Sequence, residues 1–143
     1  VAAAIRPHLR GGPCRLYSGD LRIRPDDHAY FYPDLVVVYG AVPVDTALET
    51  QNPTLVVEVL SPATRGIDRL VKFRRYRNAT SLREYVLVDS QEPVADVYRL
   101  EDGGHWGVQS YQAPQAVHLA AIGLSLDFST IYEDVDWSAA PGR

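Results

Sequence analysis

Two acidic residues and the only lysine of the chain have the types and positions that could do chemistry. Asp34 stands at the mouth of an apolar run, and Glu58 lies inside a second apolar run, Pro53–Leu60. Lys72 lies on the segment that follows the second run. A carboxylate within an apolar run loses its hydration and needs a cation, a metal ion or hydrogen-bond donors to remain charged. The two acids therefore indicate a site.

The elements that must position these residues can be predicted from periodicity. Short apolar runs bounded by proline or glycine are typical of strands that are covered on both faces, which predicts strands over Phe31–Tyr39 and Leu55–Leu60. If the two strands pair, Asp34 and Glu58 come together. The following segment, Arg65–Arg77, has the apolar periodicity of a helix, and it would carry Lys72 back over the strand ends.

Two carboxylates with an open face suit a hard divalent ion such as Mg²⁺ or Mn²⁺, which prefers oxygen ligands and retains several waters. Such an ion lowers the pKa of a bound water and neutralises charge that builds up on a phosphate. A lysine beside the ion can position that water or hold a phosphate oxygen. Asp34, Glu58 and Lys72 together therefore predict a phosphodiester hydrolase.

The rest of the chain predicts a single α/β domain over residues 1–143, with a frayed tail at 138–143. We expect an N-terminal helix, a β-hairpin, a further buried strand, an antiparallel C-terminal meander, and a last short strand that leads into a terminal helical turn. In order, these are Ala2–Arg10, Cys14–Tyr17 with Leu21–Arg24, Glu84–Asp89, Val94–Leu100 with Trp106–Tyr111, Val117–Ala121 with Leu124–Phe128, and Ser129–Tyr132.

Composition limits the classes of function. The net charge of -4 argues against a protein that binds nucleic acid mainly through a basic surface, although a local basic groove remains possible. No apolar run approaches the length of a membrane span, and Cys14 is the only cysteine, so we expect a reducing, cytoplasmic setting without membrane contact. The chain has no methionine and begins at Val1, so we expect an incomplete N-terminus.

Several spaced elements resemble one known family. They are Tyr32-Pro33-Asp34, Glu58-Val59-Leu60-Ser61-Pro62-x-Thr64, Asp68-x-x-x-Lys72-x-x-x-Tyr76 and Glu84-Tyr85. This set, in this order, resembles the Uma-type restriction endonuclease family of the PD-(D/E)XK nuclease superfamily. The resemblance implies a restriction-endonuclease-like fold, with a mixed central β-sheet and flanking helices. It also implies Asp34 and Glu58 as metal ligands, with a backbone carbonyl at Val59 or Leu60 assisting.

The chain departs from the superfamily pattern at two places. The position two after the glutamate should be lysine, and here it is Leu60; the resemblance implies that Lys72 replaces it. An acid that is often found on the first helix has no counterpart in Ala2–Arg10, and Asp20 is a weak substitute. Supporting roles near the site fall to Asp68, Tyr76 and Ser61, and weaker contacts to a nucleic-acid backbone fall to Arg69 and Arg75.

Simpler interpretations stay open for most of these residues. Asp34 could be an ordinary strand-start acid, and Glu58 could form a buried ion pair with Arg65 or Arg69. Asp68 and Lys72 could be only an i, i+4 pair on a helix surface. Ser61 could cap the helix, the arginines could line a solvated helix face, and Tyr76 could be a packing residue.

Two further groups of residues are interpreted as structural. Tyr30, Phe31 and Tyr32 are expected in the core and at its rim, not as base-stacking residues. The acids of the loop Pro25–His28 are expected to be solvated.

The residues and the resemblance together favour a divalent-metal-dependent nuclease that hydrolyses DNA, with a homodimer as a possible assembly. The alternative is a non-catalytic scaffold or interaction module that retains a nuclease-like fold. Leu60, the acidic net charge and the missing first-helix acid favour that alternative.

Overall fold

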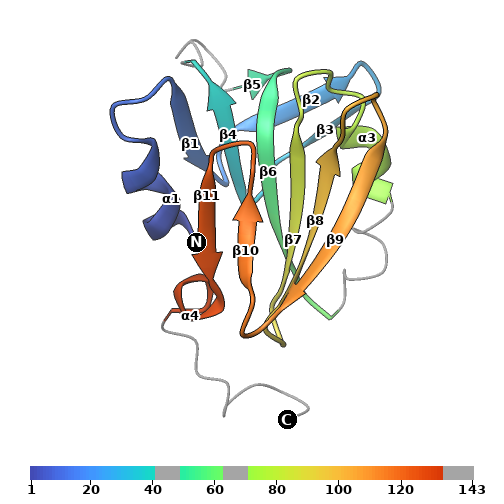
Figure 1. Cartoon of the computed structure of the whole chain (residues 1–143). Coiled ribbons are helices and arrows are strands. Elements are labelled where there is room, and N and C mark those ends of the chain that lie inside the picture. The colour runs from blue at the N-terminus through green and yellow to red at the C-terminus, as the bar shows by residue number, and fades with distance from the viewer. Residues whose placement is uncertain (41–48, 63–70, 134–143) are drawn as a thin grey trace.

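The computed structural model describes residues 1–40, 49–62 and 71–133, and a mixed six-stranded sheet forms its centre (Figure 1). The strand order in this sheet is β1-β4-β6-β7-β8-β9. Its strands are β1 (Cys14–Ser18), β4 (Leu35–Tyr39), β6 (Pro53–Leu60), β7 (Glu84–Asp89), β8 (Val94–Leu100) and β9 (Trp106–Gln112). Strands β6 and β7 run parallel, whereas the other neighbouring pairs are antiparallel.

In the part of the chain that the structure describes, two smaller sheets and three short helices surround this centre. The three-stranded sheet contains β2 (Arg22–Asp26), β3 (Ala29–Phe31) and β5 (Glu49–Thr50), and the two-stranded sheet contains β10 (Ala116–Leu119) and β11 (Leu124–Asp127). The helices are α1 (Ala2–Leu9), α3 (Phe73–Tyr76) and α4 (Phe128–Ile131). No helix among the described residues has the length and apolar character needed to cross a membrane.

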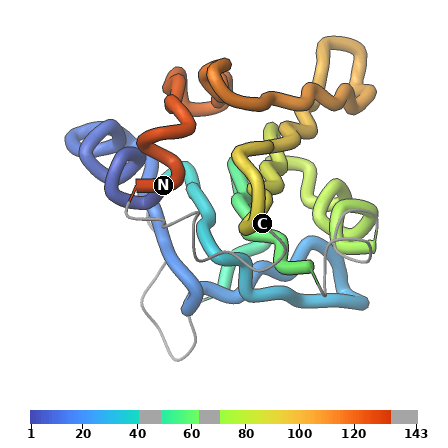
Figure 2. Tube along the Cα trace, turned by 90° about the horizontal axis from the view of Figure 1, so that it is seen from below, coloured from blue at the N-terminus to red at the C-terminus, as the bar shows by residue number. Residues whose placement is uncertain are grey.

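The central sheet is covered on both faces, and strand β6 shows how its sequence serves both. Successive side chains of a strand point to opposite faces. Leu55 and Val57 pack in one buried cluster with residues of α1, β10 and β11, while Val56 and Leu60 pack in a second cluster with residues of β2 and α3. Figure 2 shows these two layers on opposite sides of the sheet. A nearly continuous apolar run was therefore the correct signature of this strand.

The restriction-endonuclease-like α/β architecture predicted from the sequence is confirmed, including the antiparallel C-terminal meander of β8 and β9. The predicted hairpin between Cys14–Tyr17 and Leu21–Arg24 is wrong. Strand β1 pairs with β4 of the central sheet, whereas β2 pairs with β3 and β5. The physical reason lies in burial: Leu16 belongs to the first cluster, and Leu21 and Ile23 belong to the second, so the chain passes from one side of the sheet to the other between them.

Three other expected elements can be compared with the structure. The predicted strand Phe31–Tyr39 is broken, with β3 ending at Phe31 and β4 starting at Leu35, because Pro33 between them cannot donate to a strand ladder. The segment Leu124–Phe128 leads into the last helical turn as expected, and most of it forms strand β11, which pairs with β10. Part of the predicted helix Arg65–Arg77 and the predicted tail lie outside the described residues; the described part contains α3, preceded by a wide helical turn at Val71 and Lys72.

Candidate active site

The two acids named from the sequence lie opposite each other on neighbouring strands. Strands β4 and β6 pair with Leu35 facing Val57, which brings Asp34, just before β4, beside Glu58. The Asp34 backbone N–H donates to Glu58 Oε1 at 3.1 Å, and the Val59 backbone N–H donates to Asp34 Oδ2 at 2.7 Å. These reciprocal bonds fix both carboxylates against the backbone of the other strand.

The two acids differ in their exposure to solvent. Asp34 is exposed, whereas Glu58 is only 4% exposed because its side chain points to the same face as Val56 and Leu60. The pair therefore joins a buried carboxylate to one that solvent or a ligand can reach.

Lys72 reaches Glu58 from the segment that precedes α3. Its Nζ lies 3.1 Å from Glu58 Oε2, and its side chain is 32% exposed, compared with 5% for that of Glu58. A wide helical turn such as the one at Val71 and Lys72 is uncommon and is frequent at functional sites. Three residues from three segments thus meet at one end of the central sheet.

The electrostatics of Glu58 reflect its position. Burial raises the pKa of the Glu58 carboxyl above its ordinary value, and the Asp34 charge acts in the same direction. The Lys72 ammonium and the Asp34 backbone N–H favour the ionised form and so oppose this rise. Glu58 is therefore a carboxylate that depends on neighbouring positive charge to remain ionised.

The donor set at this place fits a hard divalent ion better than a soft one, because it offers carboxylate oxygens and no thiolate or imidazole. No group of three or more histidine, cysteine, aspartate or glutamate side chains could ligate a metal in the part of the chain that the structure describes. Asp34 and Glu58 would therefore supply two protein ligands and leave the other positions of an ion to water and substrate.

The residues predicted to support the site differ in where the structure places them. Tyr76 is fully buried, and its ring packs against Phe31 and Tyr85 with centroid distances of 4.9 and 5.2 Å. Ser61 is half-buried and directly follows β6. Asp68 and Arg69 lie outside the described residues, together with Arg65, the other proposed partner of Glu58.

Leu60 and Arg75 have structural neighbours. Leu60, at the position where the superfamily has lysine, is 4% exposed and belongs to the apolar cluster beneath α3. Its carbonyl oxygen accepts a bond from the Ser90 N–H at 3.0 Å. Arg75 Nη1 lies 3.7 Å from Asp26 Oδ2, so its charge already has a partner on β2.

The expectation that the acids of Pro25–His28 are solvated is wrong for Asp26. Its carboxylate accepts bonds from Asn78 Nδ2 and from the His28 N–H, both at 2.8 Å. The Asn78 bond, followed by the His28 bond and the Arg75 charge, holds the pKa of Asp26 below its ordinary value. Asp26 thereby fastens β2 to the end of α3.

A hollow of about 410 Å³ adjoins Asp34. Its polar lining comes from Asp34, Asp89, Ser90 and Tyr132, and its apolar wall comes from Leu35 and valines of the sheet together with residues of α1 and α4. The Tyr132 hydroxyl lies 2.6 Å from the Asp89 carbonyl oxygen and 2.7 Å from that of Glu92, which fixes the chain after α4 at this end of the sheet.

Sequence reasoning did not place Asp89, Ser90 and Tyr132 near the acids. A usable signal existed for the first two, since β6 and β7 run parallel and their carboxyl ends meet at the same edge of the sheet. For Tyr132 no local pattern indicates which strand ends it would reach.

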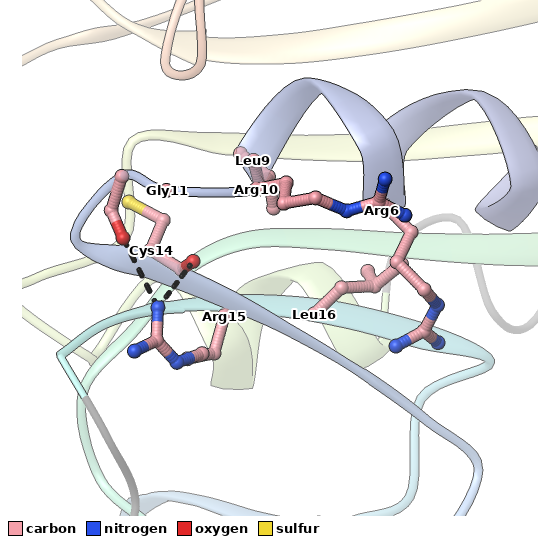
Figure 3. Close-up of a pocket in the computed structure, with 8 residues that line it drawn as sticks. Arg6, Leu9, Arg10, Gly11, Cys14, Arg15 and Leu16 are labelled. Carbon is pink, nitrogen blue, oxygen red and sulfur yellow. Dashed lines mark hydrogen bonds between the residues drawn. The ribbon is translucent and has the colours of Figure 1, made fainter.

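A second hollow, of about 460 Å³, lies elsewhere (Figure 3). Arg6 of α1, Arg10 directly after α1, and Arg15 of β1 line this hollow. The Arg15 guanidinium donates a hydrogen bond to the Gly12 carbonyl oxygen at 3.0 Å. Because Cys14 pairs with Tyr39 and Ser18 pairs with Leu35, this hollow lies at the opposite end of β1 and β4 from Asp34. It is therefore separate from the acid pair.

Glu84 shows that a buried acid need not belong to the site. It is 1% exposed at the start of β7, the end of that strand remote from Asp89. Its carboxylate accepts bonds from Arg99 Nε at 2.7 Å and from the N–H groups of Ala120 and Ala121 at 3.0 and 2.7 Å. Glu84 is thus fully paired and ties the β10–β11 hairpin to the central sheet.

Comparisons with known proteins cover most of the chain. The model of a family described as "Putative restriction endonuclease" (Uma2) matches residues 1–129. Uncharacterized protein slr1290 of Synechocystis is 38% identical over 126 residues, which cover 87% of this chain and 66% of that protein. Uncharacterized protein sll1609 of the same organism is 34% identical over 77 residues, which cover 52% of this chain and 44% of that protein. The chain thus spans less than two thirds of either relative.

A solved structure agrees with the fold. A crystal structure from Anabaena variabilis, described as a "putative nuclease belonging to DUF820", superposes with a TM-score of 0.67. The sequence identity is 17%, and the match covers 92% of this chain and 75% of the other. At this identity the likeness shows a shared architecture.

Proposed function

Because the chain belongs to the Uma2 restriction endonuclease family, we propose that it is a divalent-metal-dependent nuclease that hydrolyses DNA phosphodiester bonds. The observation that carries this proposal is the meeting of Asp34, Glu58 and Lys72 at one end of the sheet, where Asp34 is exposed and Lys72 is partly exposed. Family membership alone would support the fold and leave the chemistry open.

Asp34 and Glu58 would hold Mg²⁺ or Mn²⁺. When bound, the ion supplies a water of lowered pKa and neutralises charge on the phosphate. Asp34 presents an exposed carboxylate to the ion, and the Val59 N–H keeps that carboxylate turned toward β6. Glu58 stays ionised with the help of nearby positive charge, which the ion would add to.

Lys72 would orient the attacking water or bind a phosphate oxygen. Its ammonium is a compact donor with three N–H groups, one third of its side chain is exposed, and it already lies within hydrogen-bond distance of Glu58. The same distance is what the simpler interpretation, a structural ion pair, requires. Catalysis and pairing therefore have to be separated by experiment.

A direct test is calorimetric titration of the purified chain with Mn²⁺, because it requires no assumption about the substrate. We expect binding in the wild type and loss of binding in Asp34→Ala. Asp102→Ala is the matched control, since Asp102 is an exposed acid in the β8–β9 turn, at the Glu84 end of the sheet. Absence of binding in the wild type, or equal binding in both variants, would contradict the metal site.

Cleavage assays then test the chemistry. Glu58→Ala should abolish metal-dependent cleavage of DNA while circular dichroism stays native. Cleavage that survives in this variant would exclude the proposed site. Metal binding without cleavage of any nucleic acid would favour the alternative function, an interaction module that retains a nuclease-like fold. That alternative rests on the buried Leu60 at the usual lysine position.

A further inference from the structure

An exposed pair of tyrosines lies immediately before Asp34. Tyr30 and Tyr32 are each 54% exposed, and their rings meet edge to face with a centroid distance of 6.2 Å. Phe31 between them points the other way and packs on Tyr76. Phe31 therefore packs against the core as expected, whereas Tyr30 and Tyr32 are exposed on the surface beside it.

Two arginines of the neighbouring strand share this surface. Strands β2 and β3 pair with Ile23 opposite Phe31, and both of these side chains belong to the second buried cluster or pack against it. Alternation along both strands then places Arg22, Arg24 and Tyr30 on the opposite, outward face, and Tyr32, just after β3, contacts Tyr30 there. We call these four side chains the tyrosine platform. Figure 2 shows β2 and β3 in the outermost layer on this side of the sheet.

The platform has the chemistry of a nucleic-acid contact. The guanidinium carbons of Arg22 and Arg24 lie 5.3 and 5.9 Å from the Tyr30 ring centroid. Both arginines pair with Glu49, at 2.7 and 3.2 Å, so two positive charges face one negative charge and one remains in excess. Aromatic rings stack on bases of any sequence, and arginine adds stacking and attraction to phosphate.

The position of the platform connects it to the acids. Tyr32 and Asp34 are separated by Pro33 alone, so at about 3.3 Å per residue in extended chain their Cα atoms lie about 7 Å apart. A strand whose base rests on the platform would therefore have its backbone beside Asp34. This geometry deepens the proposed nuclease function and rests on it for the meaning of the neighbouring acids.

We propose that the tyrosine platform binds an unstacked base of a single-stranded nucleic acid and directs that strand to the Asp34–Glu58 pair. Within a duplex the faces of each base are covered by its neighbours, so an exposed ring face can receive only an unpaired base. The substrate class is accordingly a single strand, or a single-stranded segment of a longer molecule.

The test is the binding of fluorescein-labelled 12-nucleotide oligo-dT, read by fluorescence anisotropy in EDTA so that no metal-dependent cleavage occurs. We expect tighter binding of this strand than of a duplex of the same length. Tyr30→Ala and Tyr32→Ala should each weaken binding by about five-fold or more, because a stacked ring contributes on the order of 1 kcal/mol or more per base. Tyr→Phe at each position should retain most of the affinity.

Tyr39→Ala is the matched control. Tyr39 is also an exposed tyrosine, 73% exposed, and it lies at the end of β4 remote from Asp34. An equal loss of affinity in this variant, equal binding of duplex and single strand, or unchanged binding in the Tyr30→Ala/Tyr32→Ala double variant would each overturn the proposal.

Two further comparisons show which kind of nucleic acid is bound and separate the platform proposal from the nuclease proposal. Oligo-U of the same length shows whether RNA or DNA is preferred, and binding of either supports the platform. Since the assay contains no metal, a chain that fails to cleave can still confirm the platform. Conversely, a chain that binds Mn²⁺ and cleaves duplex without single-strand binding would retain the nuclease function and refute the platform.

Discussion

Replacing Lys72 by methionine tests whether the cation keeps Glu58 ionised. Methionine retains most of the apolar stem of lysine and removes the charge, so packing changes little. The substitution leaves a buried carboxylate whose nearest described cation is gone. Because Lys72 lowers the pKa of Glu58 against the effect of burial, the variant should have a Glu58 pKa that is raised further.

The magnitude follows from the distance. Two unit charges separated by 3.1 Å attract by about 5 kcal/mol at an effective dielectric constant of about 20. One third of the Lys72 side chain is exposed, and solvent screening reduces the loss to about 2–3 kcal/mol. This loss applies only where Glu58 is ionised.

The pH dependence has a defined sign. A carboxyl whose folded pKa is raised binds its proton more tightly in the folded state, so its contribution to stability is present below the ordinary glutamate pKa and is lost as pH rises through the folded pKa. The wild type should lose some stability in this window, and Lys72→Met should lose about 2–3 kcal/mol more at pH 8, with a much smaller difference at pH 5.

Urea unfolding at both pH values measures this difference. Lys72→Arg, which keeps the charge, is the control and should resemble the wild type. Adding Glu58→Gln to Lys72→Met should remove the pH dependence of the difference. A destabilisation that is the same at pH 5 and pH 8, or one that persists undiminished in the double variant, would refute the electrostatic reasoning.

Two other predictions concern stability. Glu84→Gln should destabilise the fold by about 2–4 kcal/mol, because an amide cannot accept all three N–H bonds and leaves Arg99 without a counter-charge. Urea unfolding measures this loss. Mn²⁺ binding should be unchanged in the variant, which would separate Glu84 from the active site. Burial raises the pKa of Tyr132 to about 12, so its contribution to stability, about 1–2 kcal/mol after allowance for solvent, should be lost as pH rises from about 10 to about 12. Tyr132→Phe should lower stability by about 1 kcal/mol at pH 8 and flatten this alkaline decline; a decline of unchanged size in the variant would assign it to another group.

Much of the central sheet could be predicted from the sequence because its strands carry their own signal. Pro53–Leu60 is apolar at every position except Thr54 and Glu58, and a strand covered on both faces requires that pattern. The exception at Glu58 stood out for the same reason. Because Asp34 directly precedes one apolar strand and Glu58 lies within the next, the pairing of these two strands was enough to predict that the acids meet.

The predicted hairpin was wrong because tertiary packing determines which strands pair with one another. Ser18-Gly19-Asp20 is a good turn signal, and Gly19 does adopt a positive φ of 63°. The turn nevertheless joins two layers and not two paired strands, because Leu16 and Ile23 are buried on opposite sides of the sheet. Apolar–polar alternation states that a strand has a buried face without stating which layer buries it.

The exposure of Tyr30 and Tyr32 could not be predicted for a related reason. Three successive aromatic residues give no indication of which one faces the core, and the answer depends on the register of β2 with β3.

The separate origin of the cation makes the site an indicator of complete folding. Asp34 and Glu58 meet as soon as β4 and β6 pair, but Lys72 reaches them only when the segment around α3 has docked on the sheet. A chain caught during synthesis or partial unfolding would hold the acids without their cation. Under the proposed function, a partly folded protein would therefore be inactive, and cleavage would require the complete fold.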